Sequence, residues 1–111
     1  TAHDVSARLA IVPMVLEARG LDITLATVER FKQQGDHLTA KVLNRIYHDE
    51  IRHVSYGTKW FESVCESQKI NHYEQWHELV KKHFRGVLKP PFNDSARHAA
   101  GLTQDYYLGI E

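Results

Sequence analysis

A glutamate and a histidine three residues apart, Glu50 and His53, interrupt an apolar pattern that otherwise has helical spacing. Continuing that pattern from Ile46 toward Trp60 arrives at Glu50, His53 and Gly57, where leucine or isoleucine would be expected. Residues three apart lie on one face of a helix, one turn from each other. A buried, unpaired carboxylate is very costly, and a bound cation is one of the few ways to offset that cost. We therefore expect both side chains to be largely buried, on the same side of one helix, as metal ligands.

A second carboxylate, Glu17, directly follows the apolar pair Val15-Leu16 and interrupts an apolar run, as Glu50 does in its own helix. The helix that carries Glu50 is expected to begin about 13 residues before it, roughly 20 Å away, and a preceding helix of about ten residues spans about 15 Å. The chain can therefore return along the bundle, so that Glu17 lies beside the long helix. We expect Glu17 to share a ligand or a water with Glu50 and His53. The alternatives are that Glu17 is an exposed residue near a helix end, or that the three side chains form a hydrogen-bonded cluster without metal.

The elements that would position these residues are all helical, because alternating apolar patterns followed by hairpin turns are nearly absent. Apolar periodicity with capping and terminating residues predicts an all-α chain, a single domain over residues 1–111, with four helices and a short C-terminal fifth. We expect Gly20 to end the first helix, Pro13 to kink it, and Thr24 to cap the next one. The expected helices cover residues 4–19, 25–34, 37–67 and 71–84, with the short one after residue 93.

Composition excludes several classes of protein. The 14 acidic and 14 basic residues balance, which disfavours a nucleic-acid-binding helical domain. The single cysteine, Cys65, cannot form an internal disulfide, and the chain has no apolar run of about 20 residues that could span a membrane. We therefore expect a cytoplasmic location. The chain opens at Thr1 rather than methionine, which predicts a processed product or a fragment of something longer.

Taken together, the motifs resemble a known family. A glutamate followed, after 31 residues, by Asp49-Glu50-Ile51-Arg52-His53 resembles the repeated signature of the di-iron oxygenase and desaturase branch of the ferritin-like superfamily. More closely, Leu16-Glu17-Ala18-Arg19-Gly20-Leu21-Asp22 with that segment resembles the ferritin-like family known as domain of unknown function 455. The tail fits that family too, with Leu88-Lys89-Pro90-Pro91-Phe92-Asn93, Ala96-Arg97 and Ala99-Ala100-Gly101.

The resemblance implies a ferritin-like helical bundle, of which this chain would be the second, C-terminal half. Glu50 would bridge two metals, while Glu17 and His53 would be terminal ligands on one of them. Asp49 and Arg52 would orient the ligands. The family has no firmly established reaction, but its fold is similar to that of a tRNA-hydroxylating monooxygenase. That similarity favours an oxygen-activating oxidoreductase or monooxygenase with iron or manganese as cofactor, metals that suit carboxylate and imidazole ligands.

The chain departs from the family pattern in one respect. The family's site takes another glutamate and another Glu-x-x-His from an earlier helix pair, and neither is present here. A missing N-terminal half, another chain that carries it, or a second copy in a homodimer would have to cover the apolar face and complete the two-metal site. The competing hypothesis is a non-enzymatic, metal-free helical module with a structural or interaction role.

Overall fold

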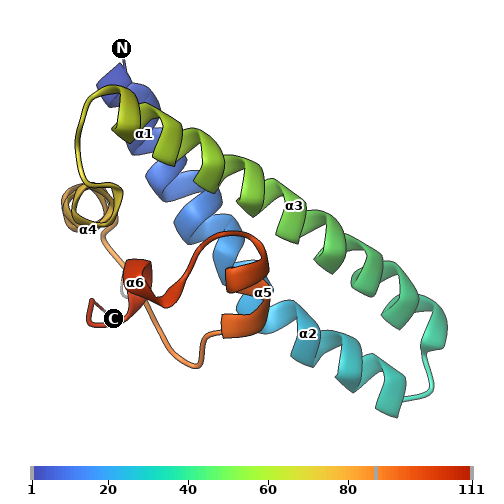
Figure 1. The fold of residues 1–111 in the computed structure, drawn as a ribbon. Helices are drawn as coiled ribbons and strands as arrows, with labels where there is room; N and C mark the ends of the chain where they lie inside the picture. Colours follow the sequence, from blue (N-terminus) through green and yellow to red (C-terminus); the bar gives the residue numbers. More distant parts are fainter. Residues whose placement is uncertain (1, 87, 111) are drawn as a thin grey trace.

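The computed structural model describes residues 2–86 and 88–110, and all regular structure within these ranges is helical. The prediction of an all-α chain is confirmed. In chain order the elements are α1 (Ala2–Ile11), the π-helix η1 (Val12–Glu17), α2 (Ala18–Gln33), α3 (His37–Ser67), α4 (His72–His83), α5 (Asp94–Ala99) and α6 (Gln104–Tyr107). Figure 1 shows α1, η1 and α2 as one long rod beside α3, with α4, α5 and α6 grouped around one part of this pair.

The long rod corrects one boundary in the sequence analysis. The helix does not end at Gly20, and Thr24 caps no new helix, because α2 runs through both positions. Glycine inside a helix costs about 1 kcal/mol relative to alanine. Ala18 and Leu21, on either side of Gly20, are fully buried, and burying apolar side chains of this kind outweighs that cost.

The disturbance expected at Pro13 takes the form of a wider helical turn. Proline has no backbone N–H and cannot join the normal helical hydrogen-bond ladder. The backbone N–H of Ala18 donates to the carbonyl oxygen of Pro13, five residues back, as in a π-helix. Single π turns inside α-helices are frequent at functional sites, and this one ends at Glu17.

The other helix boundaries coincide with capping residues. Asp36 accepts a hydrogen bond from the backbone N–H of Thr39 (3.1 Å) at the start of α3, and Asn71 accepts one from that of Glu74 (3.0 Å) at the start of α4. Gly35, with φ of +81°, adopts the left-handed conformation that ends α2. The predicted bounds of α3 are confirmed, whereas the short helix α6 was not predicted.

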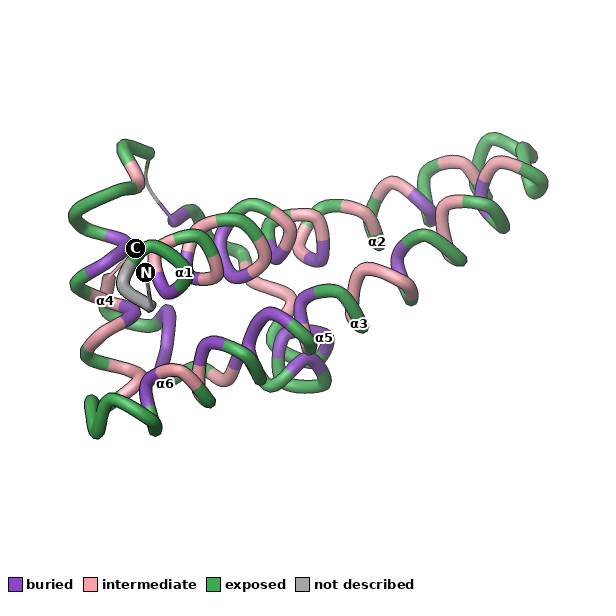
Figure 2. Tube along the Cα trace, turned by 90° about the horizontal axis from the view of Figure 1, so that it is seen from above, coloured by how far each residue is buried: buried purple, intermediate pink, exposed green. Residues whose placement is uncertain are grey.

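The core lies where α4, α5 and α6 meet the helix pair, as the buried segments in Figure 2 show. Trp76 and Val80 of α4 are buried, while Tyr73 of α4 and Phe84, which directly follows α4, are only partly buried. The largest fully buried side chains come from five helical elements and the segment before α6: Trp76, Tyr106, Tyr107, Phe61, Met14, Leu21, Leu79 and Leu102. Among the described residues, no helix combines the length and apolar character that crossing a membrane requires.

Candidate metal centre

Helix α3 presents Glu50 and His53 side by side. Nδ1 of His53 lies 3.0 Å from Oε1 of Glu50, a hydrogen bond in which a protonated Nδ1 donates to the carboxylate. The two side chains therefore share one face of one continuous helix, as predicted. The prediction that both are largely buried is wrong: the side chain of His53 is 58% exposed and that of Glu50 27%. The physical reason is that α4 and α5 pack on other sides of the helix pair and leave this edge open.

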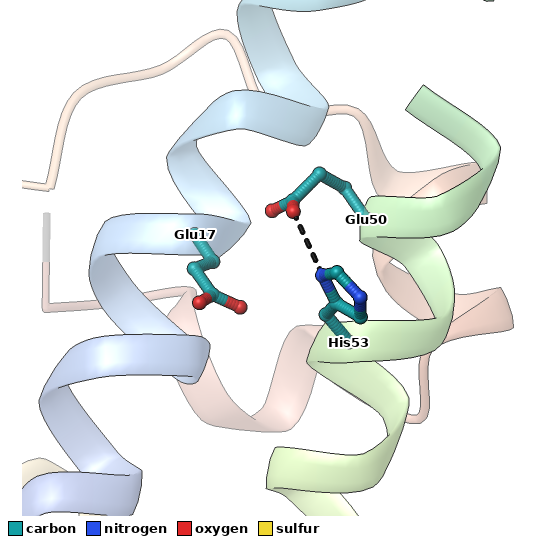
Figure 3. A group of neighbouring side chains, drawn as sticks. All are labelled: Glu17, Glu50 and His53. Carbon is teal, nitrogen blue, oxygen red and sulfur yellow. Dashed lines mark hydrogen bonds and ion pairs between the residues drawn. The ribbon is translucent and has the colours of Figure 1, made fainter. Parts of the chain in front are cut away.

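Glu17, the last residue of η1, faces this pair from the opposite helix (Figure 3). One ligand atom from each of Glu17, Glu50 and His53 lies within 4.8 Å of the other two. The predicted proximity of Glu17 is confirmed, and the alternative that it is an exposed residue near a helix end is wrong, because its burial is intermediate and the helical rod continues past it. Two residues from α3 and one from η1, more than thirty positions apart in sequence, thus converge.

A close contact between the two helices brings these side chains together. A Cβ atom built on Gly57 of α3 would lie 2.3 Å from Cγ of Pro13, so only glycine fits there. Gly57 is one turn beyond His53, and Pro13 is one turn before Glu17. The glycine therefore sets the helix separation at the level of the cluster, and the proline determines both the contact and the π turn.

The electrostatics of the cluster raise the pKa of the Glu17 carboxyl group above its ordinary value. Partial burial is the largest cause, the negative charge of Glu50 adds to it, and His53 opposes it. A second carboxylate close by disfavours ionisation of the first. A bound cation would relieve this repulsion and favour the charged forms of both acids.

The three side chains fit a metal ion in type and in spacing. Carboxylate oxygens and imidazole nitrogens bind metals at about 2.0–2.2 Å, so two ligands of one ion lie at most about 4.4 Å apart. The separations of up to 4.8 Å in the cluster need only small side-chain rotations to meet this limit. Three ligands leave further positions on an ion open to other groups.

Asp49 and Arg52, expected to orient the ligands, form an ion pair with each other. Nη2 of Arg52 donates to Oδ1 of Asp49 at 2.8 Å, and the two side chains are 70% and 41% exposed, respectively. Together with His53 and Tyr56 they line a shallow hollow on the surface. Their role as supports of the ligands stays a prediction.

Spacing alone does not make a metal site in this chain. Glu74 and His77 repeat the Glu-x-x-His pattern on α4. There, however, Nε2 of His77 lies 2.6 Å from the backbone oxygen of Tyr106. Among the described residues, the only group of three potential metal ligands in reach of one another is the Glu17 cluster.

The sequence analysis missed a second polar cluster, around Asp22 and Arg97. The guanidinium of Arg97 donates to both oxygens of Asp22 at 2.8 and 2.7 Å, and the backbone N–H of Asn93 donates to the same carboxylate at 2.8 Å. The rings of Phe92 and Tyr107 lie against the guanidinium, at 4.8 and 4.6 Å from their centroids. Both charged residues belong to the motifs that carried the family resemblance, which was the available signal.

Fold and site together define an all-α protein in which two long helical segments bring two glutamates and a histidine into one cluster. The chain belongs to the family described as "Protein of unknown function (DUF455)", which matches residues 1–108. It is 38% identical over 104 residues to an uncharacterized protein of Haemophilus influenzae (strain ATCC 51907 / DSM 11121 / KW20 / Rd). The match covers 94% of this chain and 36% of that relative, so the chain spans about a third of the relative's length. No solved structure matches the chain.

Proposed function

We propose that this chain carries one half of a two-metal carboxylate centre of the ferritin-like type, and that the complete protein is an oxygen-activating oxidoreductase. The observation that carries the proposal is the convergence of Glu17, Glu50 and His53 from two antiparallel helices. A glutamate on one helix and a Glu-x-x-His unit on its neighbour are half of the ligand set found in di-iron and di-manganese helical bundles.

Within this proposal each side chain has a distinct task. Glu17, Glu50 and His53 would hold the metals, with Glu50 as the shared ligand and Glu17 and His53 as ligands of one of them. The contact of His53 Nδ1 with Glu50 holds the imidazole beside this carboxylate, and Nδ1 would have to lose its proton and give up this hydrogen bond to bind a metal. Mixed carboxylate and imidazole ligation suits iron or manganese, and such a pair supplies the redox chemistry that activates oxygen.

The alternative is a metal-free structural or interaction module. It is favoured by the hydrogen bond between Glu50 and His53, which satisfies both groups without a cation. The position of Glu17 favours the metal, because it brings a third potential ligand to the hydrogen-bonded pair on α3, with one ligand atom of each residue within 4.8 Å of the other two. Metal binding therefore distinguishes the two functions.

The test is anaerobic titration of the purified chain with Fe(II) and, separately, with Mn(II), followed by calorimetry and elemental analysis. Glu50→Gln keeps the shape of the side chain and removes its charge, so we expect the dissociation constant to rise at least tenfold. Glu74→Gln, at the exposed first position of the other Glu-x-x-His, is the matched control and should bind metal like the unchanged chain.

Metal binding should also appear as stabilisation of the fold. A ligand that binds only the folded state at 100 times its dissociation constant adds about 2.7 kcal/mol to the free energy of unfolding. We expect this increment for the chain and for Glu74→Gln, and its loss for Glu50→Gln. Equal metal affinity in both variants, or no binding by the unchanged chain, would reject the metal centre in favour of the metal-free module.

A further inference from the structure

Residues 88–93 carried part of the family resemblance, yet the metal cluster uses none of them. They lead into α5, which packs against both α2 and α3 (Figure 1). The side-chain amide of Asn93, at the start of α5, donates to both helices at once. Its Nδ2 lies 3.0 Å from the backbone oxygen of Leu21 on α2 and 2.7 Å from the hydroxyl oxygen of Tyr47 on α3. One side chain of the tail therefore ties α2 to α3.

The amide that forms this bridge is itself held in place. The backbone N–H of Asn93 donates to Oδ1 of Asp22 at 2.8 Å, and its side-chain oxygen accepts from the backbone N–H of Ala96 at 3.2 Å. One turn further along α5, Arg97 donates to both oxygens of the same Asp22. The bridge therefore starts from a fixed point on α2, and a change in the separation of α2 and α3 would break it.

The bridge and the proline–glycine contact lie at opposite ends of the metal cluster. Leu21 is one turn beyond Glu17 on the long rod, and Tyr47 is one turn before Glu50 on α3. Because the two helices run antiparallel, both partners of Asn93 lie at the same end of the cluster, away from the proline–glycine contact. The cluster thus lies between two contacts that set the helix separation, one by packing and one by hydrogen bonds.

A metal site in this position depends on that separation. The ligand atoms of Glu17, Glu50 and His53 lie within 4.8 Å of one another, and two ligands of one ion lie at most about 4.4 Å apart. Functional sites need their side chains held within about 0.5 Å of the productive geometry by supporting residues. The hydrogen bond inside the cluster joins Glu50 to His53 on α3 alone, so the distance to Glu17 has to be set from outside the cluster.

We propose that Asn93 and Tyr47 are positioning residues of the metal centre. The amide of Asn93 fixes the separation of α2 and α3, and with it the distance of Glu17 from Glu50 and His53. This inference rests on the proposed function and gives the tail of the chain a task in it. Every contact in the bridge joins residues of this chain, so the inference does not depend on what else packs against the exposed side of the cluster.

The first test removes one end of the bridge. Tyr47→Phe deletes the hydroxyl that accepts from Asn93 and keeps the buried ring. Tyr107→Phe is the matched control, because it deletes the hydroxyl of another buried tyrosine, which donates to Asp94 and joins α6 to α5 instead. We expect the dissociation constant for Fe(II) or Mn(II) to rise about tenfold in Tyr47→Phe, the lower end of what supporting residues contribute. The control should change it less than about twofold, as for sites that share no partner.

The second test removes the amide. In Asn93→Ser the start of α5 keeps a good cap, but the shorter side chain cannot reach both helices. Asn71→Ser, at the cap of α4, is its matched control. We expect Asn93→Ser to weaken metal binding as Tyr47→Phe does. The effects of the two should not add in the double variant, because both remove the same bridge.

A readout without metal reports the geometry directly. Nuclear Overhauser contacts between the side chains of Glu17 and His53 should weaken in Tyr47→Phe and persist in Tyr107→Phe. Urea unfolding should show similar losses of stability in these two variants, since each loses one hydrogen bond of a buried tyrosine. A residue with only a structural role would lower stability without changing these contacts. Circular dichroism checks that each variant folds.

The outcomes separate this inference from the proposed function. If the unchanged chain binds metal and Tyr47→Phe alters neither the affinity nor the Overhauser contacts, the inference is overturned and the proposed function stands. Equal losses of affinity in Tyr47→Phe and Tyr107→Phe also overturn it, because general stability of the tail would then explain both. If the unchanged chain binds no metal, the proposed function is rejected. The contacts of Glu17 with His53 then decide alone: their loss in Tyr47→Phe supports positioning by the bridge, and their persistence overturns it.

Discussion

Two acids on the same helical rod, Glu17 and Asp22, lie five residues apart and have opposite surroundings. Both oxygens of Asp22 accept hydrogen bonds from Arg97, and its side chain is 1% exposed. Glu17 faces Glu50 and His53, and its pKa is raised. The chain itself neutralises the first carboxylate, whereas partial burial and the nearby charge of Glu50 disfavour ionisation of the second. If the proposed function is right, this contrast separates a structural acid, Asp22, from a metal ligand, Glu17.

The largest effect is expected from breaking the Asp22–Arg97 pair. Arg97→Met keeps the length of the side chain and leaves Asp22 as a buried, unpaired charge, which costs about 3–5 kcal/mol. Urea unfolding measures the loss. The control is Arg52→Met, which breaks the exposed pair with Asp49 and should cost less than about 1 kcal/mol. Equal losses in the two variants would mean that the Asp22 cluster does not hold the C-terminal tail on α2.

The next effect concerns the helix contact that sets the geometry of the Glu17 cluster. In Gly57→Ala the new methyl group would overlap the ring of Pro13, so the helices must separate, at a cost of about 1–3 kcal/mol. We also expect weaker metal binding, since Glu17 moves away from α3.

Gly20→Ala is the matched control for this substitution. A Cβ atom on Gly20 meets nothing within 4 Å, and replacing glycine by alanine inside a helix stabilises it by about 0.5–1 kcal/mol. Urea unfolding of both variants should therefore show effects of opposite sign on stability. Metal titration should show weaker binding for Gly57→Ala only. If Gly57→Ala were neutral in both measurements, the close contact would not determine the site.

The smallest effect is the pH dependence that Glu17 contributes. Because its pKa is higher in the folded chain than its ordinary value of 4.5, the folded state holds the proton more tightly. The free energy of unfolding therefore falls as the pH rises through this range. In the metal-free chain, Glu17→Gln should be more stable than the unchanged chain at pH 7, by less than about 1 kcal/mol, and equally stable near pH 3.

Thermal unfolding with a chelator present measures this difference. Glu74→Gln should show no such pH-dependent gain, because Glu74 is exposed and remote from the cluster. A Glu17→Gln chain that is less stable at pH 7 would mean that attraction to His53 outweighs both burial and repulsion by Glu50. In that case Glu17 would resemble Asp22, and the contrast between the two acids would disappear.

Local signals predicted much of the fold because they act within a few residues. Helix α3 begins and ends at the predicted residues, Asn71 caps α4 at the predicted start, and Gly35 follows the end of α2. Gly20 carries the same signal as Gly35, but α2 continues through it because neighbouring side chains are buried against α3. Whether a glycine ends a helix depends on what packs around it, and a local pattern does not contain that information.

The sequence by itself determined that the chain is helical and that Glu17, Glu50 and His53 can meet, since residue type and helical spacing suffice for both. Only the tertiary structure decided how they meet. The contact of Pro13 with Gly57 and the π turn that ends at Glu17 bring the two helices into register. The tertiary structure also decided that His53 is exposed and that the apolar residues beside it face outward. Periodicity shows that a helix has an apolar face, whereas which neighbour covers that face depends on the packing of elements far apart in the chain.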